Sequence, residues 1–306
     1  MNLYFAPLEG ITTYIYRNTH AEVFGGCDGY YAPFITPSDN EKVTRKGLRD
    51  VVPEKNSTLN LTVQVLTNRS DSFLKFARKI KALGYREVNI NLGCPFERVI
   101  RKGRGAGMLK DTEELDRFLD GVFSGCDLKV SVKTRTGFYS SEEMEKLIEV
   151  YNNYPLSLLI IHPRAREDFY KGTPDMATFS AAYKQANAPV CYNGDITTVS
   201  EFQKIREAFP AAEGVMIGRG AITNPALFRE IKGGEPLTIG ELVTFSDRLA
   251  ENYFEVLQSE TFTLQKLKEV WGYMAKQVPE EAKFMKKIKK ASTRGELSFI
   301  VNQLGV

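Results

Sequence analysis

The stretch that decides the fold runs from residue 189 to residue 220 and reads PVCYNGDITTVSEFQKIREAFPAAEGVMIGRG. An apolar segment, residues 189–192, is followed by a polar turn, a segment with helical periodicity (200–208) and a second apolar segment, 214–217. Short apolar runs separated by a helical pattern predict buried strands joined by a helix. The stretch is therefore interpreted as a strand, a helix and a further strand, with a glycine-containing turn after each strand.

The same alternation extends back to the N-terminus. The predicted strands are residues 2–5, 29–32, 61–66, 87–91, 129–133, 156–161, 189–192 and 214–217. The predicted helices are residues 14–24, 71–83, 113–124, 142–152, 176–186, 200–208 and 225–231, and the long link 33–60 shows no clear helix. Eight strands interleaved with helices over about 230 residues have the size and order of a (β/α)₈ TIM barrel.

A doubly wound open sheet is the alternative α/β architecture. It would predict a Gly-x-Gly-x-x-Gly turn after the first strand, whereas Pro7-Leu8-Glu9-Gly10 follows there. We therefore predict the α/β class with a TIM barrel. Side-chain caps support the predicted helix starts, each with a carboxylate three residues on: Asp111-x-x-Glu114, Ser140-x-x-Glu143, Thr198-x-x-Glu201 and Thr238-x-x-Glu241.

A second domain follows the barrel. The segment Lys232-Gly233-Gly234-Glu235-Pro236 ends a helix and begins a linker. From Thr238 to Val306 the sequence shows only helical patterns, roughly three helices. We predict a catalytic barrel over residues 1–236 and a small all-α domain over residues 237–306.

Composition excludes several classes of protein. Hydrophobic residues make up 42% of the 306 and charged residues 26%, as in ordinary globular proteins, and the net charge of +3 does not by itself indicate a nucleic-acid partner. The N-terminus lacks the features of a signal peptide, and the most apolar run, residues 156–161, is too short to span a membrane. Four cysteines without a Cys-x-x-Cys pair and only two histidines predict no disulfide framework and no metal site. We expect a cytoplasmic protein with reduced cysteines.

Polar residues gather at the carboxyl ends of the predicted strands, where a TIM barrel carries its active site. Besides Gln64 in the third strand, these segments read Pro7-Leu8-Glu9-Gly10, Asn89-Ile90-Asn91-Leu92-Gly93-Cys94-Pro95, Lys133-Thr134-Arg135-Thr136-Gly137, His162-Pro163-Arg164-Ala165-Arg166, Asn193-Gly194-Asp195 and Gly218-Arg219-Gly220. The last two follow strands seven and eight, the usual phosphate site of the fold. Tight turns would explain one such loop, but two in these places favour a phosphate.

Lys133 ends a buried strand, where a charged amine is costly unless an anion meets it. A reduced flavin carries negative charge on its pyrimidine edge, which a fixed lysine would stabilise, and Gln64 could hydrogen-bond the same ring. The alternative is that Lys133 pairs with a barrel carboxylate such as Glu9. His162 lies on the rim and is expected to touch the phosphate or the flavin, whereas His20 in the first helix is expected to be structural.

Cys94 differs from the other cysteines because it lies in a Gly-Cys-Pro turn on the predicted catalytic rim. With an ordinary pKa near 8.5 a thiol is mostly protonated at neutral pH, so Cys94 can donate a proton. Cys27, Cys126 and Cys191 are expected to be small buried hydrophobic residues.

Basic residues occur in two groups that suit a polynucleotide. Arg98, Arg101, Lys102 and Arg104 follow Cys94. In the tail, Lys283, Lys286, Lys287 and Lys290 are spaced to share one helix face, with Lys289 beside them, while Phe284 and Ile288 can face inward. A lysine-rich face is usually only solvated, and it indicates RNA here in combination with the barrel motifs.

Together these motifs resemble the dihydrouridine synthase family over essentially the whole chain. The matching segments are residues 6–10, 91–95, 105–107, 133–135, 162–164, 193–196 and 218–221, and residues 265–273 resemble the family's helical-domain motif. Some positions depart from the family's common pattern and bear on which uridine is modified: Glu9 replaces a small residue, Thr13 an acid, and Ala165 and Asp168 alter the motif after strand six.

The resemblance implies FMN-dependent reduction of uridine to 5,6-dihydrouridine in tRNA, with NADPH as electron donor and Cys94 as proton donor. It implies non-covalent FMN contacts at Pro7, Leu8, Glu9, Gln64, Lys133, His162, Asn193, Gly194, Asp195, Gly218 and Arg219. We assign substrate contacts to Asn91, Arg135, Arg164, Lys268 and Lys286. Ribosomal RNA stays open as the alternative RNA, and we expect a monomer without membrane or metal partners.

Two rival functions remain at this stage. A dihydroorotate dehydrogenase-like enzyme is also an FMN barrel with a comparable Asn and Cys-Pro segment, but it acts on a free pyrimidine and needs no basic tail. An RNA-binding protein that keeps a flavin without turnover is the other rival, and Cys94, Lys133 and the phosphate loops argue against it.

Overall fold

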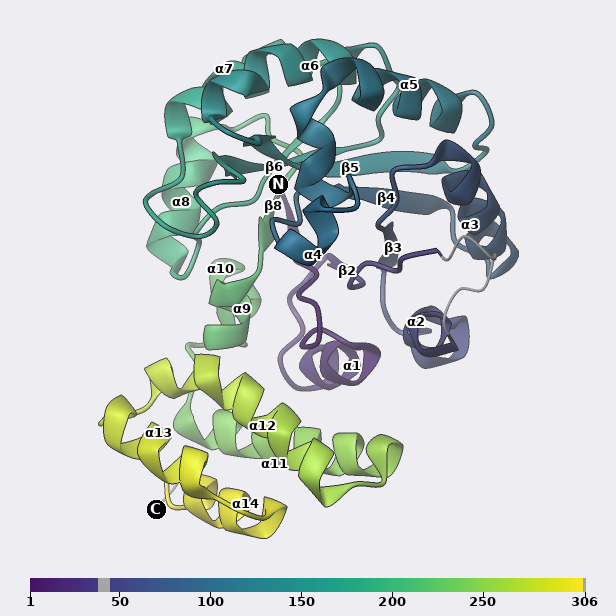
Figure 1. Ribbon diagram of the computed structural model, residues 1–306. Coiled ribbons are helices and arrows are strands. Elements are labelled where there is room, and N and C mark those ends of the chain that lie inside the picture. The colour runs from purple at the N-terminus through teal and green to yellow at the C-terminus, as the bar shows by residue number, and fades with distance from the viewer. Residues whose placement is uncertain (38–44, 305–306) are drawn as a thin grey trace.

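Eight parallel strands close into a barrel in chain order, and β8 pairs back onto β1. The structure, a computed structural model, describes residues 1–37 and 45–304 (Figure 1). The strands are β1 (Asn2–Phe5), β2 (Gly29–Tyr31), β3 (Leu61–Val65), β4 (Glu87–Leu92), β5 (Lys129–Gly137), β6 (Leu159–Ala165), β7 (Val190–Tyr192) and β8 (Gly214–Ile217). The predicted TIM barrel is confirmed.

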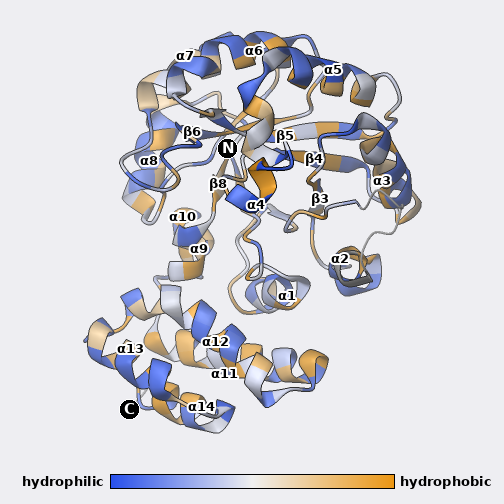
Figure 2. Ribbon diagram, viewed as in Figure 1, coloured by the Kyte–Doolittle hydropathy of each residue, from blue (hydrophilic) through white to orange (hydrophobic). Residues whose placement is uncertain are grey.

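Helices lie between the strands and cover the outside of the barrel (Figure 1). They are α1 (Tyr14–Val23), α2 (Arg45–Val51), α3 (Ser70–Ala82), α4 (Glu97–Ile100), α5 (Thr112–Phe123), α6 (Met144–Asn152), α7 (Met176–Gln185), α8 (Val199–Ala208), α9 (Arg219–Thr223) and α10 (Leu227–Ile231). The 3₁₀ helices are η1 (Pro53–Lys55), η2 (Gly105–Lys110) and η3 (Ser141–Glu143). Figure 2 shows apolar and hydrophilic residues interleaved along these helices, as expected for helices that bury one face and expose the other.

The link between β2 and β3 differs from the prediction because it contains α2 and η1. A buried arginine of α1 fixes this segment: Arg17 donates to the carboxylate and carbonyl of Asp50 and to Asn56 Oδ1, at 2.7–2.9 Å. These contacts reach far along the chain and leave no periodic signal in the sequence. Residues 38–44 of the link lie outside the described part of the chain.

β5 and β6 extend further than predicted, to Gly137 and Ala165 instead of residues 133 and 161. The added residues pair with one another, Arg135 with His162 and Gly137 with Ala165, across a register irregularity. Side chains expected in loops therefore project from paired backbone, which holds them more rigidly. β6 also begins later than predicted, at Leu159.

The barrel interior is filled by apolar side chains from several strands. Cys191 is fully buried among them, with Ile160 and Met216 beside it, as expected for a structural cysteine. Because side chains fill the barrel below the rim, a ligand can bind only at the carboxyl ends of the strands.

Side chains cap most of the predicted helix starts. Asp111 caps α5, and Thr198 forms a capping box with Glu201 at α8. The prediction for Ser140 is wrong: its side chain makes no capping hydrogen bond. Glu143 instead turns back and accepts the backbone N–H of Phe138 at 2.6 Å.

The C-terminal part contains four α-helices rather than the predicted three: α11 (Ile239–Leu257), α12 (Glu260–Met274), α13 (Glu281–Lys290) and α14 (Arg294–Asn302). A short 3₁₀ helix, η4 (Ala275–Gln277), follows α12. These helices lie together beside the barrel (Figure 1). The predicted domain boundary at residues 236 and 237 falls between α10 and α11 and stays a prediction as a boundary between folding units.

The helices pack on the barrel through α1 and α9, which contact α11 and α12. Phe245 of α11 lies against the rings of Tyr16 and Phe24, with centroids 5.6 and 5.1 Å away. Trp271 is fully buried in α12 and donates to Ser246 Oγ at 2.9 Å. The apolar core is continuous from the barrel helices into this domain. None of the helices in the described ranges is long and apolar enough to cross a membrane.

Candidate active site

A cavity of about 970 Å³ opens at the carboxyl ends of the strands. Its lining brings together most of the predicted site residues: Pro7, Leu8, Glu9, Gln64, Asn91, Cys94, Lys133, Arg135, His162, Asn193, Gly194, Asp195, Gly218 and Arg219. Arg164, Lys268 and Lys286 do not line it. Residues that the sequence did not single out complete the wall: Phe34 and Tyr170 from barrel loops, and Tyr273 and Lys276 from the helical domain.

Buried amides connect the strands on one side of the cavity. Asn91 Nδ2 donates to Gln64 Oε1, and Gln64 Nε2 donates to Asn89 Oδ1, both at 2.7 Å. Asn89 continues the chain to Ser131 Oγ, 2.9 Å away. Because each amide is oriented by the next, the polar floor of the cavity is fixed.

The Cys94 turn is built on this floor. Asn91 Oδ1 accepts the backbone N–H groups of Gly93 (3.2 Å) and Cys94 (2.9 Å). Gly105 packs behind the cysteine with φ +57, and a Cβ there would lie 2.9 Å from the Cys94 carbonyl oxygen, so the turn requires glycine at this position.

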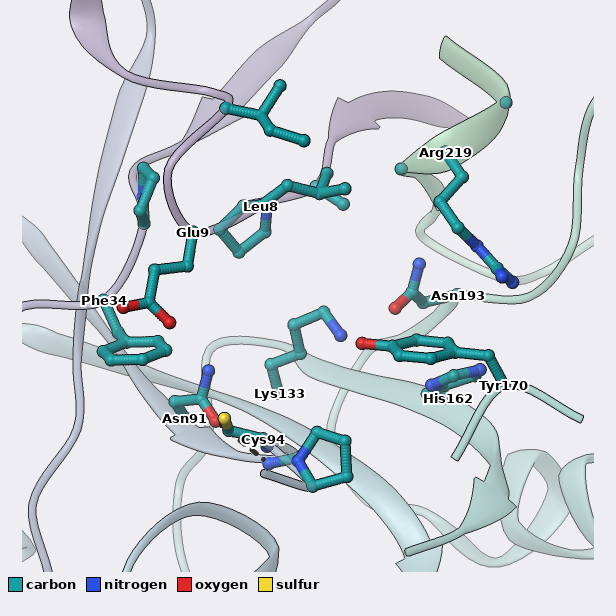
Figure 3. A pocket seen from close by; sticks show the side chains of 18 of the residues that line it. Leu8, Glu9, Phe34, Asn91, Cys94, Lys133, His162, Tyr170, Asn193 and Arg219 are labelled. Carbon is teal, nitrogen blue, oxygen red and sulfur yellow. Dashed lines mark hydrogen bonds between the residues drawn. The ribbon is translucent and has the colours of Figure 1, made fainter. Parts of the chain in front are cut away.

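The Cys94 side chain is directed into the cavity (Figure 3). Burial raises the pKa of its thiol, and the nearby negative charge of Glu9 acts in the same direction. A raised pKa keeps the thiol protonated at neutral pH. Cys94 can therefore act as a general acid and is poorly suited to act as a thiolate nucleophile.

Lys133 extends its amine toward the middle of the cavity (Figure 3). Burial lowers the pKa of this amine to about 8, and the positive charge of Arg135 contributes. Within residues 1–37 and 45–304 no hydrogen bond or ion pair to it is found. Glu9 instead pairs with Arg98, at 2.6 Å, so the alternative pairing of Lys133 with Glu9 is wrong. A half-buried ammonium without an anionic partner favours the binding of a negatively charged ligand, to which it can donate hydrogen bonds.

The opposite end of the cavity is organised around Asp195. Its carboxylate accepts Arg164 Nη2 at 2.5 Å and Arg219 Nη2 at 2.6 Å. Burial acts to raise the pKa of Asp195, but the hydrogen bond and charge of Arg164, together with Arg219, lower it overall. Asp195 therefore holds Arg219 at the cavity wall as a fixed cation.

Three residues that line the same corner carry backbone N–H groups without a partner among the described residues. Those of Gly194, Asp195 and Gly218 make no backbone or side-chain hydrogen bond with any described residue. A Cβ on Gly194 would lie 1.9 Å from the Tyr192 hydroxyl, so only glycine fits there. Unpaired N–H groups beside an arginine are the elements of an anion site.

Arg164 is 1% exposed and lies behind the wall rather than in it. Apart from Asp195, it donates to the carbonyls of Lys171 (3.0 Å) and Gly172 (2.6 Å). The interpretation of Arg164 as a substrate contact is therefore replaced by a structural one, in which it ties Asp195 to the loop after β6.

That loop carries Tyr170 over the cavity, between the guanidinium groups of Arg135 (5.3 Å) and Arg219 (4.7 Å from the ring centroid). His162 stacks on the same ring, 6.2 Å between centroids. Burial and the charge of Arg135 lower the pKa of His162 well below its ordinary value, so the ring is neutral. Since Arg164 Nη1 donates to His162 Nε2 (3.2 Å), the ring proton is assigned to Nδ1.

The two predicted RNA contacts in the C-terminal helices, Lys268 and Lys286, lie in different surroundings. Lys268 donates to the carbonyls of Lys289 (3.0 Å) and Ala291 (2.6 Å), so two of its three N–H donors cap the C-terminal end of α13. Its contact with RNA stays a prediction. Lys286 is exposed on α13. Phe284 and Ile288 of the same helix are buried, as predicted. Across the described ranges, no group of three or more His, Cys, Asp or Glu residues could hold a metal ion.

Comparison with known proteins gives a consistent result. The family model described as dihydrouridine synthase (Dus) matches residues 4–303. A tRNA-dihydrouridine synthase B from Yersinia pestis is 30% identical over 254 residues, covering 79% of this chain and 77% of that protein. A probable tRNA-dihydrouridine synthase from Rickettsia conorii is 25% identical, covering 92% and 87%. A solved structure of a variant of NCR from Zymomonas mobilis shares the fold, with a TM-score of 0.52, 16% identity, and coverage of 78% and 88%.

Proposed function

The chain belongs to the dihydrouridine synthase family, and from that premise we propose that it reduces uridine to 5,6-dihydrouridine in tRNA, using FMN and NADPH. The family supports an oxidoreductase that acts on tRNA. One observation carries the finer proposal: the protonated thiol of Cys94 and the unpaired amine of Lys133 face the same cavity. An acid and a cation in one cavity suit the addition of a hydride and a proton to a pyrimidine.

The residues of the cavity fit a phosphate-bearing flavin. The N–H groups of Gly194 and Gly218 with Arg219 would hold the phosphate, and Lys133 would meet the electron-rich edge of the ring. The remaining contacts that we propose are Pro7, Leu8, Glu9, Gln64, His162, Asn193 and Asp195. When bound, FMN supplies the hydride.

The side chains of the protein account for the proton. Cys94 donates its thiol proton to carbon 5 of uracil and is left as a thiolate, which takes a proton back from solvent before the next turnover. Asn91 holds the turn on which the thiol lies. Arg135 donates to the carbonyls of Gly93 and Ala165, both at 2.9 Å, and so joins the Cys94 turn to the end of β6 beside the uracil.

RNA reaches this site only with the target base outside its stack. The cavity lies between the barrel and the helical domain, which contributes Tyr273 and Lys276 to its wall. We propose that the helical domain and the lysines of α13 bind the surrounding RNA. Location in the cytoplasm and a monomeric state stay predictions.

The test is a reaction with purified protein, NADPH and an unmodified tRNA transcript, followed by digestion and mass spectrometry of the nucleosides. The proposal expects uridine that has gained two hydrogens, with none formed without NADPH. Parallel reactions with NADH or with ribosomal RNA, and a separate reaction of free dihydroorotate with an artificial electron acceptor in place of NADPH, identify the electron donor and the substrate. Turnover of dihydroorotate with unchanged tRNA would overturn the proposal in favour of a free-pyrimidine enzyme.

A further inference from the structure

An aromatic ring is exposed on the rim directly beside the cavity. Phe96 lies two residues after Cys94 and immediately before α4, and its residue is 44% exposed. It also contributes to the cavity lining. Most large apolar side chains of the described chain are buried, so an exposed phenyl ring next to the general acid calls for a functional account.

Side chains of the loop after β6 pack against this ring and hold it in place. Phe169, from the loop after β6, meets Phe96 edge-to-face with centroids 6.5 Å apart. The guanidinium of Arg166 lies 5.2 Å from the centroids of both Phe169 and Phe138, with a side chain only 12% exposed. Phe169 adopts a left-handed backbone, φ +53, which is strained for a phenylalanine and is maintained by these contacts.

The same arginine fixes the segment that carries Phe96. Arg166 Nε donates to the Pro95 carbonyl at 3.3 Å, and Nη2 pairs with Glu97 at 2.9 Å. Phe96 is therefore bracketed by two anchored residues. A ring held in this way loses little conformational entropy when a ligand packs on it.

Two arginines follow the ring in the chain. Arg98 in α4 and Arg101 directly after it are both exposed, and among the described residues each forms an ion pair with a glutamate that is itself partly exposed, Glu9 and Glu97 respectively. Exposed ion pairs of this kind are weak, so a phosphate can displace them. An exposed aromatic ring with accessible arginines two and five residues later in the chain has the chemistry that binds single-stranded nucleic acid.

We propose that Phe96 is a stacking platform for the nucleobase next to the uridine that enters the cavity. This inference rests on the proposed function, because a flipped base leaves its neighbours without a stacking partner on one side. Phe96 replaces that partner at the point where the strand leaves the cavity. Its role is to bind and position RNA, and it takes no part in proton transfer.

The test compares Phe96→Ala, Phe96→Leu and Phe96→Trp, with Phe299→Ala as the matched control. Phe299 is also an exposed phenylalanine, 67% against 44% for Phe96, and it lies on α14, on the side of the helical domain away from the barrel (Figure 1). The dissociation constant of an unmodified tRNA transcript is measured over a range of salt concentrations. Flavin content and melting temperature establish that each variant is folded.

Stacking predicts that Phe96→Ala weakens tRNA binding by roughly 5- to 150-fold. Phe96→Leu should lose most of the same affinity, Phe96→Trp should keep it, and Phe299→Ala should match wild type. The slope of log Kd against log salt should not change in any of them, because no charge is removed.

Equal affinities for wild type and Phe96→Ala, or full affinity in Phe96→Leu, would overturn the platform while leaving uridine reduction intact. A wild-type protein that binds no tRNA would overturn the platform and the proposed function together. A separate measurement of dihydrouridine formation by the wild-type protein distinguishes these two outcomes.

Discussion

The barrel mouth and the exposed face of α13 both carry positive charge, but they hold it in opposite ways. At the mouth, the exposed pair of Arg98 with Glu9 is weak, but Arg219 is paired with Asp195, which also pairs with the buried Arg164. On α13, by contrast, the lysines at 286, 287 and 290 are exposed and make no hydrogen bond or ion pair with any described residue. Paired, oriented charges fix where a ligand lies, whereas free lysines attract a polyanion without defining its position. We therefore propose that the mouth carries the chemistry and that α13 attracts RNA.

The largest expected effect comes from removing the acid at the mouth. Cys94→Ala should be reduced by NADPH at the wild-type rate, since that half of the reaction needs no proton for the substrate. Reoxidation of the reduced variant by tRNA should slow by about 10²–10⁴-fold, the usual contribution of a general acid. Stopped-flow absorbance of the flavin measures both halves.

Cys191→Ala is the control, because Cys191 is buried inside the barrel away from the cavity lining. It should change neither half of the reaction and should lower only stability, through the small void that it leaves. If Cys94→Ala were reoxidised by tRNA as fast as wild type, the proton would have to come from another group.

The second effect is on stability and its pH dependence. The pKa of Lys133 in the fold is about 8, below the ordinary 10.5, so between these values the unfolded chain binds more protons than the folded one. The free energy of unfolding therefore rises with pH from about 8 to about 10.5, and below pH 8 the buried charge destabilises the fold. Lys133→Met should stabilise the flavin-free protein at pH 7 by at most on the order of 3 kcal/mol.

Urea unfolding of both proteins at pH 7 and pH 9.5 measures this difference. The gain from Lys133→Met should shrink at the higher pH. A difference between the two proteins that is independent of pH would mean that the amine keeps an ordinary pKa.

The third effect concerns the anion site formed by Arg219 and the backbone N–H groups of Gly194, Asp195 and Gly218. Arg219→Ala should weaken retention of FMN by about tenfold or more, because it removes a charge-assisted hydrogen bond to the phosphate. The FMN retention of Arg219→Lys should lie between those of wild type and Arg219→Ala, since lysine keeps the charge but lacks the planar guanidinium group. Flavin absorbance after extensive dialysis is the measurement, and full occupancy in Arg219→Ala would place the phosphate elsewhere.

The smallest effect is expected on the α13 face. Replacement of Lys283, Lys286, Lys287 and Lys290 by glutamine should flatten the dependence of tRNA affinity on salt, by up to about 0.7–0.9 in slope for each lysine that neutralises a phosphate in the wild type. Flavin content should not change. An unchanged slope would mean that this face is only solvated surface.

The sequence predicts the mouth well because strand ends are recognisable. Asn91, Lys133 and Asp195 are far apart in the chain, yet each follows or ends an apolar run, and the carboxyl ends of parallel barrel strands must converge. Cys94 could be distinguished from Cys191 for the same reason, since one lies after a strand end and the other within a strand.

What sequence reasoning missed depends on contacts between distant segments. Tyr170 reaches the cavity from the loop after β6. Tyr273 lies in the motif at residues 265–273, but that motif does not indicate that its helix meets the mouth of the barrel. Arg164 and Lys268 are cationic residues in the right motifs, but the folded chain supplies carbonyl groups that occupy their donors. A sequence does not tell whether a ligand or the protein's own backbone will meet a buried cation.

The division between mouth and α13 is tested most directly by the steady-state rate of dihydrouridine formation, measured against tRNA concentration. Cys94→Ala and the α13 quadruple glutamine variant are compared with wild type in this assay. The account predicts that Cys94→Ala lowers kcat with little change in KM, and that the α13 variant raises KM with little change in kcat. A lowered kcat in the α13 variant together with a raised KM in Cys94→Ala would contradict it.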